Sequence, residues 1–293
     1  MAKSWNGTET LPVLSLLLGA GLWGTYWWPL YFFSQHGLGG PWLVALLYLF
    51  LSILGGGWLL LGKVEMPALS HWPVYLALAF FGGWTNVAFM LALFRGPVVV
   101  VLLLFYLSPV WSVVLARFWL RESVPLRGWL GVGLALLGCV LVVLNQHHDT
   151  TGQWDGWILF LGLSSGFAFS LTNVVLRGAD YLPDGARAVV IWWGCASLAL
   201  LVAVFTPWPD HPHWQISFLP LFSWFWVGLA TITTVYGVSR LPLSLSALIM
   251  PMEVIVGAAS AWILAGQAMT IVELMGAALI LSASVLMVMG RPS

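Results

Sequence analysis

Apolar runs of about 20 residues recur along the whole chain, and no other feature limits the fold as strongly. A helix of that length crosses the hydrocarbon core of a bilayer, which is roughly 30 Å thick. The mean hydropathy is +0.97, and charged residues make up 7% of the 293 residues. Soluble domains carry about 25% charged residues, so the chain is expected to be an integral membrane protein.

Glycine, proline and charged clusters divide the chain into apolar segments. Each segment should be a helix, because lipid cannot satisfy the hydrogen bonds of an exposed backbone. A barrel would instead show alternating strands of about ten residues. The predicted fold class is therefore all-α, with ten transmembrane helices. The expected spans are 11–33, 40–61, 73–94, 97–120, 128–145, 156–177, 187–206, 216–238, 242–265 and 270–289.

The distribution of Lys and Arg orients these helices. With ten spans both termini lie on one side of the membrane, and of the 10 basic residues only Arg95 falls on the other side. Because positive charge is concentrated in cytoplasmic loops, both termini are predicted to be cytoplasmic. The predicted location is the inner membrane of a bacterial cell.

The two halves of the chain are similar in sequence. Residues 122–144 align without gaps with residues 267–289, and the same offset of 145 residues places Arg95 on Arg240. Chance similarity between two apolar segments is the alternative explanation. A true repeat is favoured because arginine and proline positions coincide at this offset, in addition to leucine positions.

Two repeats of five helices set the predicted domain organisation. The N-terminal repeat covers residues 1–145, and the C-terminal repeat covers residues 146–293. Because five is an odd number, the second repeat must enter the membrane from the opposite side. Inverted repeats characterise secondary transporters, in which a site near the midplane opens alternately to each side.

Three stretches carry a resemblance to a known family: LWGTYW at 22–27, residues 106–143 and residues 248–288. Through them the chain resembles the EamA-domain family of the drug/metabolite transporter superfamily, including its aromatic amino acid exporters, over nearly the whole length. The resemblance implies a ten-helix carrier of small metabolites, commonly an exporter, with a cavity lined mainly by helices 1, 3, 4, 6, 8 and 9. Glu122 matches an acidic turn of the family, whereas Gln267 departs from it in the second half.

Glu253 is the most informative single residue, because it falls near the middle of the ninth span. A carboxylate at that depth costs at least about 2.5 kcal/mol on insertion scales, so it should face the interior of the bundle. It is predicted to mark a substrate path or a path for a coupled proton. A structural acid, hydrogen-bonded to a neighbouring helix, is the alternative. Glu273, near the start of the tenth span, is instead expected to be a first-turn residue stabilised by the helix dipole.

Pro109 and Pro251 lie inside the fourth and ninth spans. A proline within a span removes one backbone hydrogen bond and kinks the helix, which frees carbonyl groups that can face a cavity. Both residues are predicted to mark kinks that serve in gating. Prolines are also common in spanning helices without such a role.

Aromatic and polar side chains inside the spans are the candidates for binding a substrate. Aromatic faces could hold a solute by stacking or cation–π contact, and buried amides and hydroxyls could hydrogen-bond it. Packing of the core and hydrogen bonding between helices are the alternative roles. The candidates are Trp23, Tyr26, Trp27, Trp84, Asn86, Tyr106, Trp111, Asn173, Thr231 and Tyr236.

The first span divides its aromatic residues between two roles. Trp23, Tyr26 and Trp27 recur at the spacing of one helical face, which is predicted to face the cavity. Trp28 and Tyr31 lie nearer the outer end of the span, where a belt of aromatic residues is expected at the membrane interface.

Other kinds of site are not expected. GWLLLGKV at 57–64 has the spacing of a phosphate-binding loop, but Val64 stands where Ser or Thr is required. Histidines and aspartates within 147–149 and 210–213 are expected to be solvated loop residues, with a metal held between the loops as the alternative. The formal net charge is +0, so nucleic acid is not an expected partner. No cofactor, metal site or catalytic group is predicted.

These features predict a secondary active transporter that exports small metabolites across the inner membrane by alternating access. An aromatic lining without an intramembrane Lys or Arg favours amino acids or aromatic and amphiphilic compounds over sugar phosphates. Import or exchange of amines or nucleosides is the alternative, and a channel or a membrane-embedded enzyme is the competing class. The expected partners are the small solute, membrane lipid and a coupled proton, and the oligomeric state is left open, a monomer included.

Overall fold

The computed structural model describes residues 10–62, 71–119, 121, 123–146, 156–177, 182–209, 213–241 and 249–289. All regular structure in these ranges is helical, and each of the ten expected spans contains helix. The all-α fold class is therefore confirmed. Glu122, the loop residues 147–149 and 210–212, and the first part of the ninth expected span lie outside the described residues.

Five of the expected spans are single helices. In the described part of the ninth span, the helix α14 begins directly after Pro251. The five single helices are α3 (Gly40–Leu60), α8 (Leu126–Gln146), α9 (Gly156–Arg177), α10 (Asp184–Ala203) and α15 (Ile271–Met289), and α14 covers Met252–Ala265.

A capping box begins α15. The carboxylate of Glu273 accepts hydrogen bonds from the backbone N–H of Thr270 at 2.7 Å and from its hydroxyl at 3.2 Å. The Thr270 hydroxyl in turn accepts one from the Glu273 N–H at 3.2 Å. Reciprocal bonds of this kind satisfy two N–H groups that a helix start would otherwise leave unpaired. The predicted role of Glu273 as a first-turn residue is confirmed.

The first span is broken into α1 (Thr10–Gly24) and α2 (Trp27–Gln35). The break covers Thr25 and Tyr26, just before Pro29. In a continuous helix residue 29 would donate to the carbonyl of residue 25, but proline has no N–H and its ring clashes with that carbonyl. The local sequence therefore explains the bend.

The fourth span is broken in the same manner into α6 (Val98–Phe105) and α7 (Ser108–Phe118). Pro109 would lie four residues after Phe105, whose carbonyl it cannot bond. The freed Phe105 carbonyl lies against α9, only 2.8 Å from where a side-chain carbon on Gly166 would be. Glycine at that position lets the broken helix and α9 approach each other closely.

The third and eighth spans each contain a π-helical turn, η3 and η5. The two turns begin 145 residues apart, at Leu78 and Ser223. Such turns widen a helix locally and are frequent at functional sites. In chain order the segments are α4 (Trp72–Ala77), η3 (Leu78–Gly82) and α5 (Gly83–Leu93), then η4 (Trp214–Phe218), α11 (Leu219–Phe222), η5 (Ser223–Gly228) and α12 (Leu229–Arg240).

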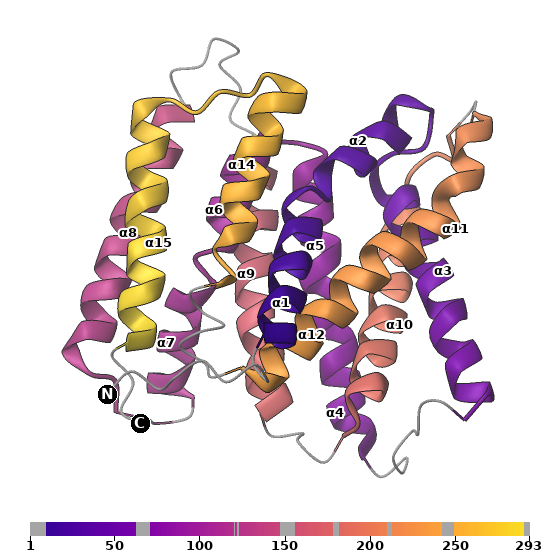
Figure 1. Cartoon of the computed structure of the whole chain (residues 1–293), viewed down its shortest axis with the longest axis horizontal. Helices are drawn as coiled ribbons and strands as arrows, with labels where there is room; N and C mark the ends of the chain where they lie inside the picture. The colour runs from indigo at the N-terminus through magenta and orange to yellow at the C-terminus, as the bar shows by residue number, and fades with distance from the viewer. Residues whose placement is uncertain are drawn as a thin grey trace.

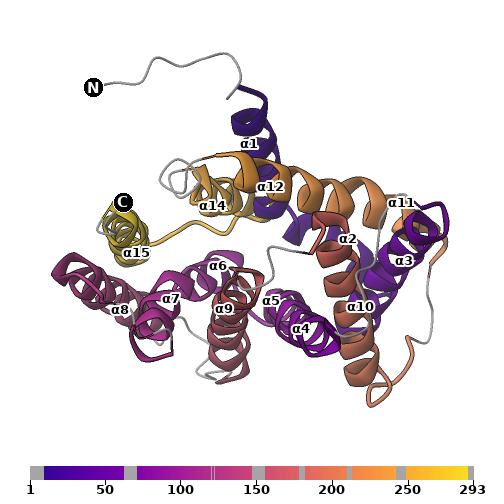
Figure 2. The same ribbon diagram turned by 90° about the horizontal axis from the view of Figure 1, so that it is seen from below.

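The helices form one layered bundle. Figures 1 and 2 show α8 and α15 side by side at one edge of the molecule and α3 and α10 at the other. Between these edges α1 packs against α12 and α14, while α9 packs against α5 and α6. In Figure 1 α1 runs upward and α15 runs downward, so the described chain begins and ends toward the same side.

Glycines allow α8 and α15 to touch backbone to backbone. A side-chain carbon on Gly138 would lie 2.6 Å from the Gly276 carbonyl oxygen, and one on Gly276 would lie 2.7 Å from the Gly138 carbonyl oxygen. Small residues at such crossings are typical of helices that pack within a membrane.

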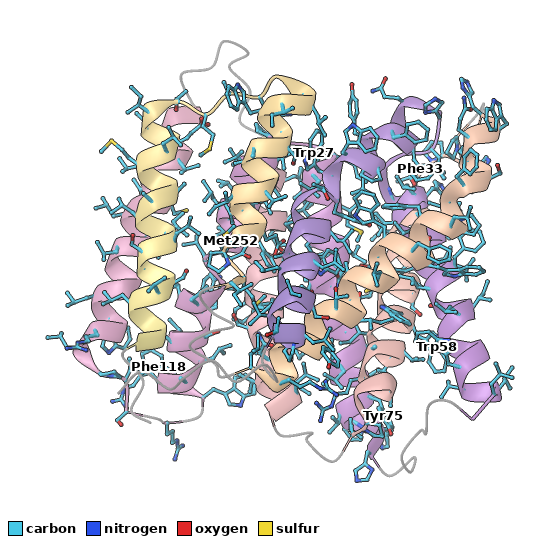
Figure 3. All side chains as sticks on the ribbon, in the orientation of Figure 1. Trp27, Phe33, Trp58, Tyr75, Phe118 and Met252 are labelled. Atoms are coloured by element: carbon cyan, nitrogen blue, oxygen red, sulfur yellow. The ribbon has the colours of Figure 1, made fainter. Side chains whose placement is uncertain are left out.

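The outward faces of the bundle are apolar. Large side chains remain exposed there, with Leu60 at 91%, Phe205 at 82% and Ile271 at 77%. Figure 3 shows Tyr75 and Phe118 near the lower ends of their helices, where an interfacial aromatic belt is expected. Six of the helical stretches are long and apolar enough to cross a membrane. The surface suits lipid rather than water.

Candidate functional site

A cavity of about 210 Å³ lies at the centre of the bundle, near the two π turns. Its walls come from α1, α3, η3, α5, α6, α9, α10, α12 and α14. The lining residues are Trp23, Tyr48, Gly82, Thr85, Asn86, Phe89, Phe105, Phe169, Thr172, Asn173, Leu176, Ile191, Trp192, Thr231, Thr234, Val235, Met250 and Glu253.

Several polar side chains of the lining already form hydrogen bonds within their own helices. The hydroxyls of Thr85, Thr172 and Thr231 each donate to the carbonyl one turn earlier in their own helix, at 2.8 Å. The amide nitrogen of Asn86 donates to the Gly82 carbonyl at 2.9 Å. The oxygen lone pairs of these hydroxyls remain for a ligand, and the Asn86 amide has a second hydrogen, so the lining can both accept and donate hydrogen bonds.

Glu253 carries the only carboxyl group among the lining residues, and no Lys, Arg or His lines the described cavity. The side chain lies in the first turn of α14 and is 7% exposed. Its Oε2 lies 3.0 Å from the hydroxyl of Tyr106, which also lies 2.6 Å from the Met250 carbonyl oxygen. The electrostatic character of the cavity therefore depends on one acid.

The structure brings several predicted site residues together. Trp23, Asn86, Asn173, Thr231 and Glu253 all line the cavity, although they come from five different spans. Tyr106 adjoins the cavity through its hydrogen bond to the Glu253 carboxyl group.

Tyr26 and Trp27 do not line the cavity. The break between α1 and α2 falls within this group of three residues, and the Tyr26 ring packs against the Trp23 ring with 5.6 Å between ring centroids, while only Trp23 is among the lining residues. The Tyr26 hydroxyl lies 3.2 Å from the Met90 sulfur in the core. The Trp27 indole donates to the Ser260 hydroxyl of α14 at 2.9 Å, and Figure 3 shows it beside that helix.

Three further candidates also lie elsewhere. The Trp84 indole donates to the Ser164 hydroxyl at 3.2 Å and joins α5 to α9. Trp111 packs edge-on against Phe167, with 5.3 Å between ring centroids. Tyr236 lies beneath the Arg240 guanidinium, 4.0 Å from its ring centroid, near the end of α12.

Pro109 and Pro251 both stand at helix starts beside the cavity. Pro109 lies in the first turn of α7, after the break that follows the lining residue Phe105. Pro251 immediately precedes α14 and lies between the lining residues Met250 and Glu253.

Sequence reasoning missed Tyr48 of α3 and Trp192 of α10, whereas Thr234 of α12 belongs to the polar residues inside the spans that could hydrogen-bond a ligand. The Thr234 hydroxyl is buried and has no hydrogen-bond partner among the described residues, and the buried Tyr48 hydroxyl has only the Cys195 thiol beside it. Buried polar atoms without partners are rare in native structures, so a ligand or water is expected to meet them. A tyrosine within the apolar run of α3 was a usable signal, because a buried phenol normally finds a partner.

The described residues hold no group of three or more His, Cys, Asp or Glu side chains suited to a metal ion. Of the loop residues weighed as metal ligands, His213 is described, and its backbone N–H bonds to the His36 carbonyl at 3.1 Å.

Comparison with known proteins adds a family to this geometry. Residues 10–144 match the model of the EamA-like transporter family. No curated protein matches the chain. Among solved structures, one crystal structure is similar over 96% of both chains, with a TM-score of 0.62 and 20% sequence identity. At that identity the likeness concerns the fold.

The EamA-like match and the apolar helices together describe a multi-pass membrane protein. The matched family is described as one of EamA-like transporters. The EamA-like match accounts for the first five spans, and the central cavity is built from these spans and from those that follow residue 144.

Proposed function

We propose that the protein is a secondary active transporter that exports amino acids or aromatic, amphiphilic solutes across the inner membrane by alternating access. One observation carries the proposal: a central cavity, walled by both halves of the chain, combines aromatic faces and hydrogen-bond acceptors with a single carboxyl group. This lining suits a solute with an ammonium group and an apolar body.

The packing supports two repeats over residues 1–145 and 146–293. The two π turns begin at the same offset, 145 residues, as the aligned segments of sequence. The contacts of α1 with α12 and α14 have counterparts in those of α9 with α5 and α6, as expected for two related halves. Related halves around a central site are the usual construction of alternating-access carriers.

The charge of the lining supports the substrate class. A phosphorylated anion would have to leave water for a cavity whose one carboxylate repels it and whose lining has no Lys, Arg or His, and an unpaired buried charge is costly. An ammonium group would instead meet the Glu253 carboxylate and the faces of Trp23 and Trp192. Amines are therefore a closer alternative to amino acids than sugar phosphates are.

The helix breaks support movement around the cavity. Trp23 lies just before the break between α1 and α2, and Phe105 lies just before the break between α6 and α7. The start of α14 at Pro251 is the third such position. Helices that are already interrupted here can rotate as half-helices about the site without breaking further backbone hydrogen bonds.

Counterflow in proteoliposomes tests the proposal. Vesicles loaded with unlabelled phenylalanine, phenethylamine or glucose 6-phosphate are diluted into labelled phenylalanine, and uptake is compared with that of protein-free vesicles. We expect loading with phenylalanine or phenethylamine to accelerate uptake, because a carrier reorients faster across the membrane when its binding site is occupied than when it is empty. A channel would show no acceleration.

Two results would overturn the proposal. Equal uptake of labelled phenylalanine with and without unlabelled solute inside the vesicles would contradict a carrier mechanism. Exchange with glucose 6-phosphate alone, measured with that compound labelled, would contradict the substrate class while leaving the carrier mechanism in place.

A further inference from the structure

We propose that Tyr106 is a positioning residue that moves its hydrogen bond between Glu253 and Met250 as Glu253 loses or gains a proton. The inference rests on the proposed transport function, because it assigns to the same cavity a device that links the charge of Glu253 to helix position. The juxtaposition that carries it is one phenol hydroxyl between two acceptors, 3.0 Å from the Glu253 Oε2 and 2.6 Å from the Met250 carbonyl oxygen.

A phenol has a single hydrogen to donate. When Glu253 is a carboxylate, Tyr106 donates to it, because hydrogen bonds to charged acceptors are the stronger ones. The Met250 carbonyl then keeps only the bond from the Glu253 backbone N–H, at 3.0 Å. The first turn of α14 is held less firmly to the break in the fourth span.

When Glu253 is protonated, its own O–H becomes a donor. The carboxyl group can then donate to the Tyr106 oxygen while Tyr106 donates to the Met250 carbonyl, so that all three groups are satisfied in one chain. The shorter of the two distances, 2.6 Å, is the one to Met250, and it matches this arrangement. The protonated state therefore fastens the start of α14 to Tyr106.

No other ionisable group competes for this contact among the described residues. The helices that pack most extensively on α14 are α1 and α6, and α2 contacts it through Trp27. None of the three contains an Asp, Glu, Lys, Arg or His. Within α14 Glu253 is the single charged residue. Tyr48 is the other titratable side chain in the lining. A proton exchanged in this part of the cavity is therefore exchanged by Glu253.

Infrared spectroscopy of the purified full-length protein tests the hydrogen bond without requiring transport. The carbonyl band of a protonated carboxyl group is assigned to Glu253 by its loss in Glu253→Gln. We expect Tyr106→Phe to move this band to higher frequency, because the carboxyl O–H loses its acceptor. Tyr31→Phe, which removes the same hydroxyl from an exposed tyrosine of α2, should leave the band in place.

Transport across a range of pH tests the coupling. Phenylalanine efflux from proteoliposomes is measured for the wild type, Glu253→Gln, Tyr106→Phe and Tyr31→Phe. A hydrogen bond to a charged group shifts an equilibrium about tenfold or more, so we expect a pH-dependent change of about that size in the wild type and in Tyr31→Phe. Tyr106→Phe should lose most of this dependence, and Glu253→Gln, which has no titrating carboxyl group, should lose it as well.

The two failures are distinguishable. An unmoved carboxyl band in Tyr106→Phe, or a pH profile equal to that of the wild type, would overturn the role of Tyr106 while wild-type counterflow continued. If the wild type exchanged none of the probes, the proposed function would fail, whereas the infrared result would still decide whether Tyr106 and Glu253 share a hydrogen bond.

Discussion

Trp23 and Trp28 lie on either side of the helix break in the first span, and their side chains have different environments. Trp23 lines the cavity, whereas Trp28 lies on α2 with 43% of its surface exposed. An aromatic contact contributes about 1 kcal/mol, which corresponds to about fivefold in affinity. We expect Trp23→Ala to raise the half-saturating phenylalanine concentration by that factor and Trp28→Ala to leave it unchanged.

The measurement is a concentration series of counterflow at equal protein content per vesicle. Trp28→Ala is the matched control, because it deletes the same side chain from the same span. An equal effect of both substitutions would mean that the loss reflects general packing of the first span and not contact with the solute.

At the scale of elements, the contact between α8 and α15 depends on two glycines. A leucine at Gly138 would drive its side chain into the Gly276 backbone, and overpacking of this kind costs about 1–3 kcal/mol. Gly133 lies in the same helix with nothing within 4 Å of its side-chain position. We expect Gly138→Leu to lower the midpoint of thermal unfolding in detergent and Gly133→Leu to preserve it.

The comparison separates packing from helix propensity. Both substitutions replace glycine in α8 by a better helix former, so propensity alone predicts a small gain at either site. A destabilised Gly133→Leu together with a stable Gly138→Leu would contradict the close approach of α8 to α15.

At the scale of the whole molecule, the inverted repeat makes a prediction about sidedness. Ser123 and Ala268 are exposed residues that precede α8 and α15, and they stand 145 residues apart. Figure 1 shows these two helices running in opposite directions. In a variant with Cys139 and Cys195 replaced by alanine, we expect a membrane-impermeant maleimide to label Ala268→Cys on intact cells. Ser123→Cys should be labelled only after the membrane is permeabilised.

The orientation follows from the distribution of positive charge, which places the loop at Ser123 in the cytoplasm. Labelling of both cysteines from outside would contradict the inverted arrangement. Reversed labelling would keep the repeat but overturn the predicted orientation.

The number and type of the spans could be predicted from the sequence, because a lipid environment requires about 20 apolar residues in each helix and internally satisfied backbone bonds. The breaks beside Pro29 and Pro109 are local as well, since each falls where a proline cannot bond the carbonyl four residues earlier. A charged residue such as Glu253 could be expected inside the bundle, because a charge that faces lipid costs free energy.

Which side chains share the cavity was decided by the tertiary structure. Trp23 lines it, but Tyr26 and Trp27, at the spacing of one helical face, are turned toward the core and toward α14 by the bend at Thr25 and Tyr26. Tyr48, a residue of another span, reaches it because of how α3 packs. The chain by itself determined its membrane fold, since burial in lipid acts on each segment separately. The site depended on the rotation of each helix against its neighbours, which only packing between distant segments sets.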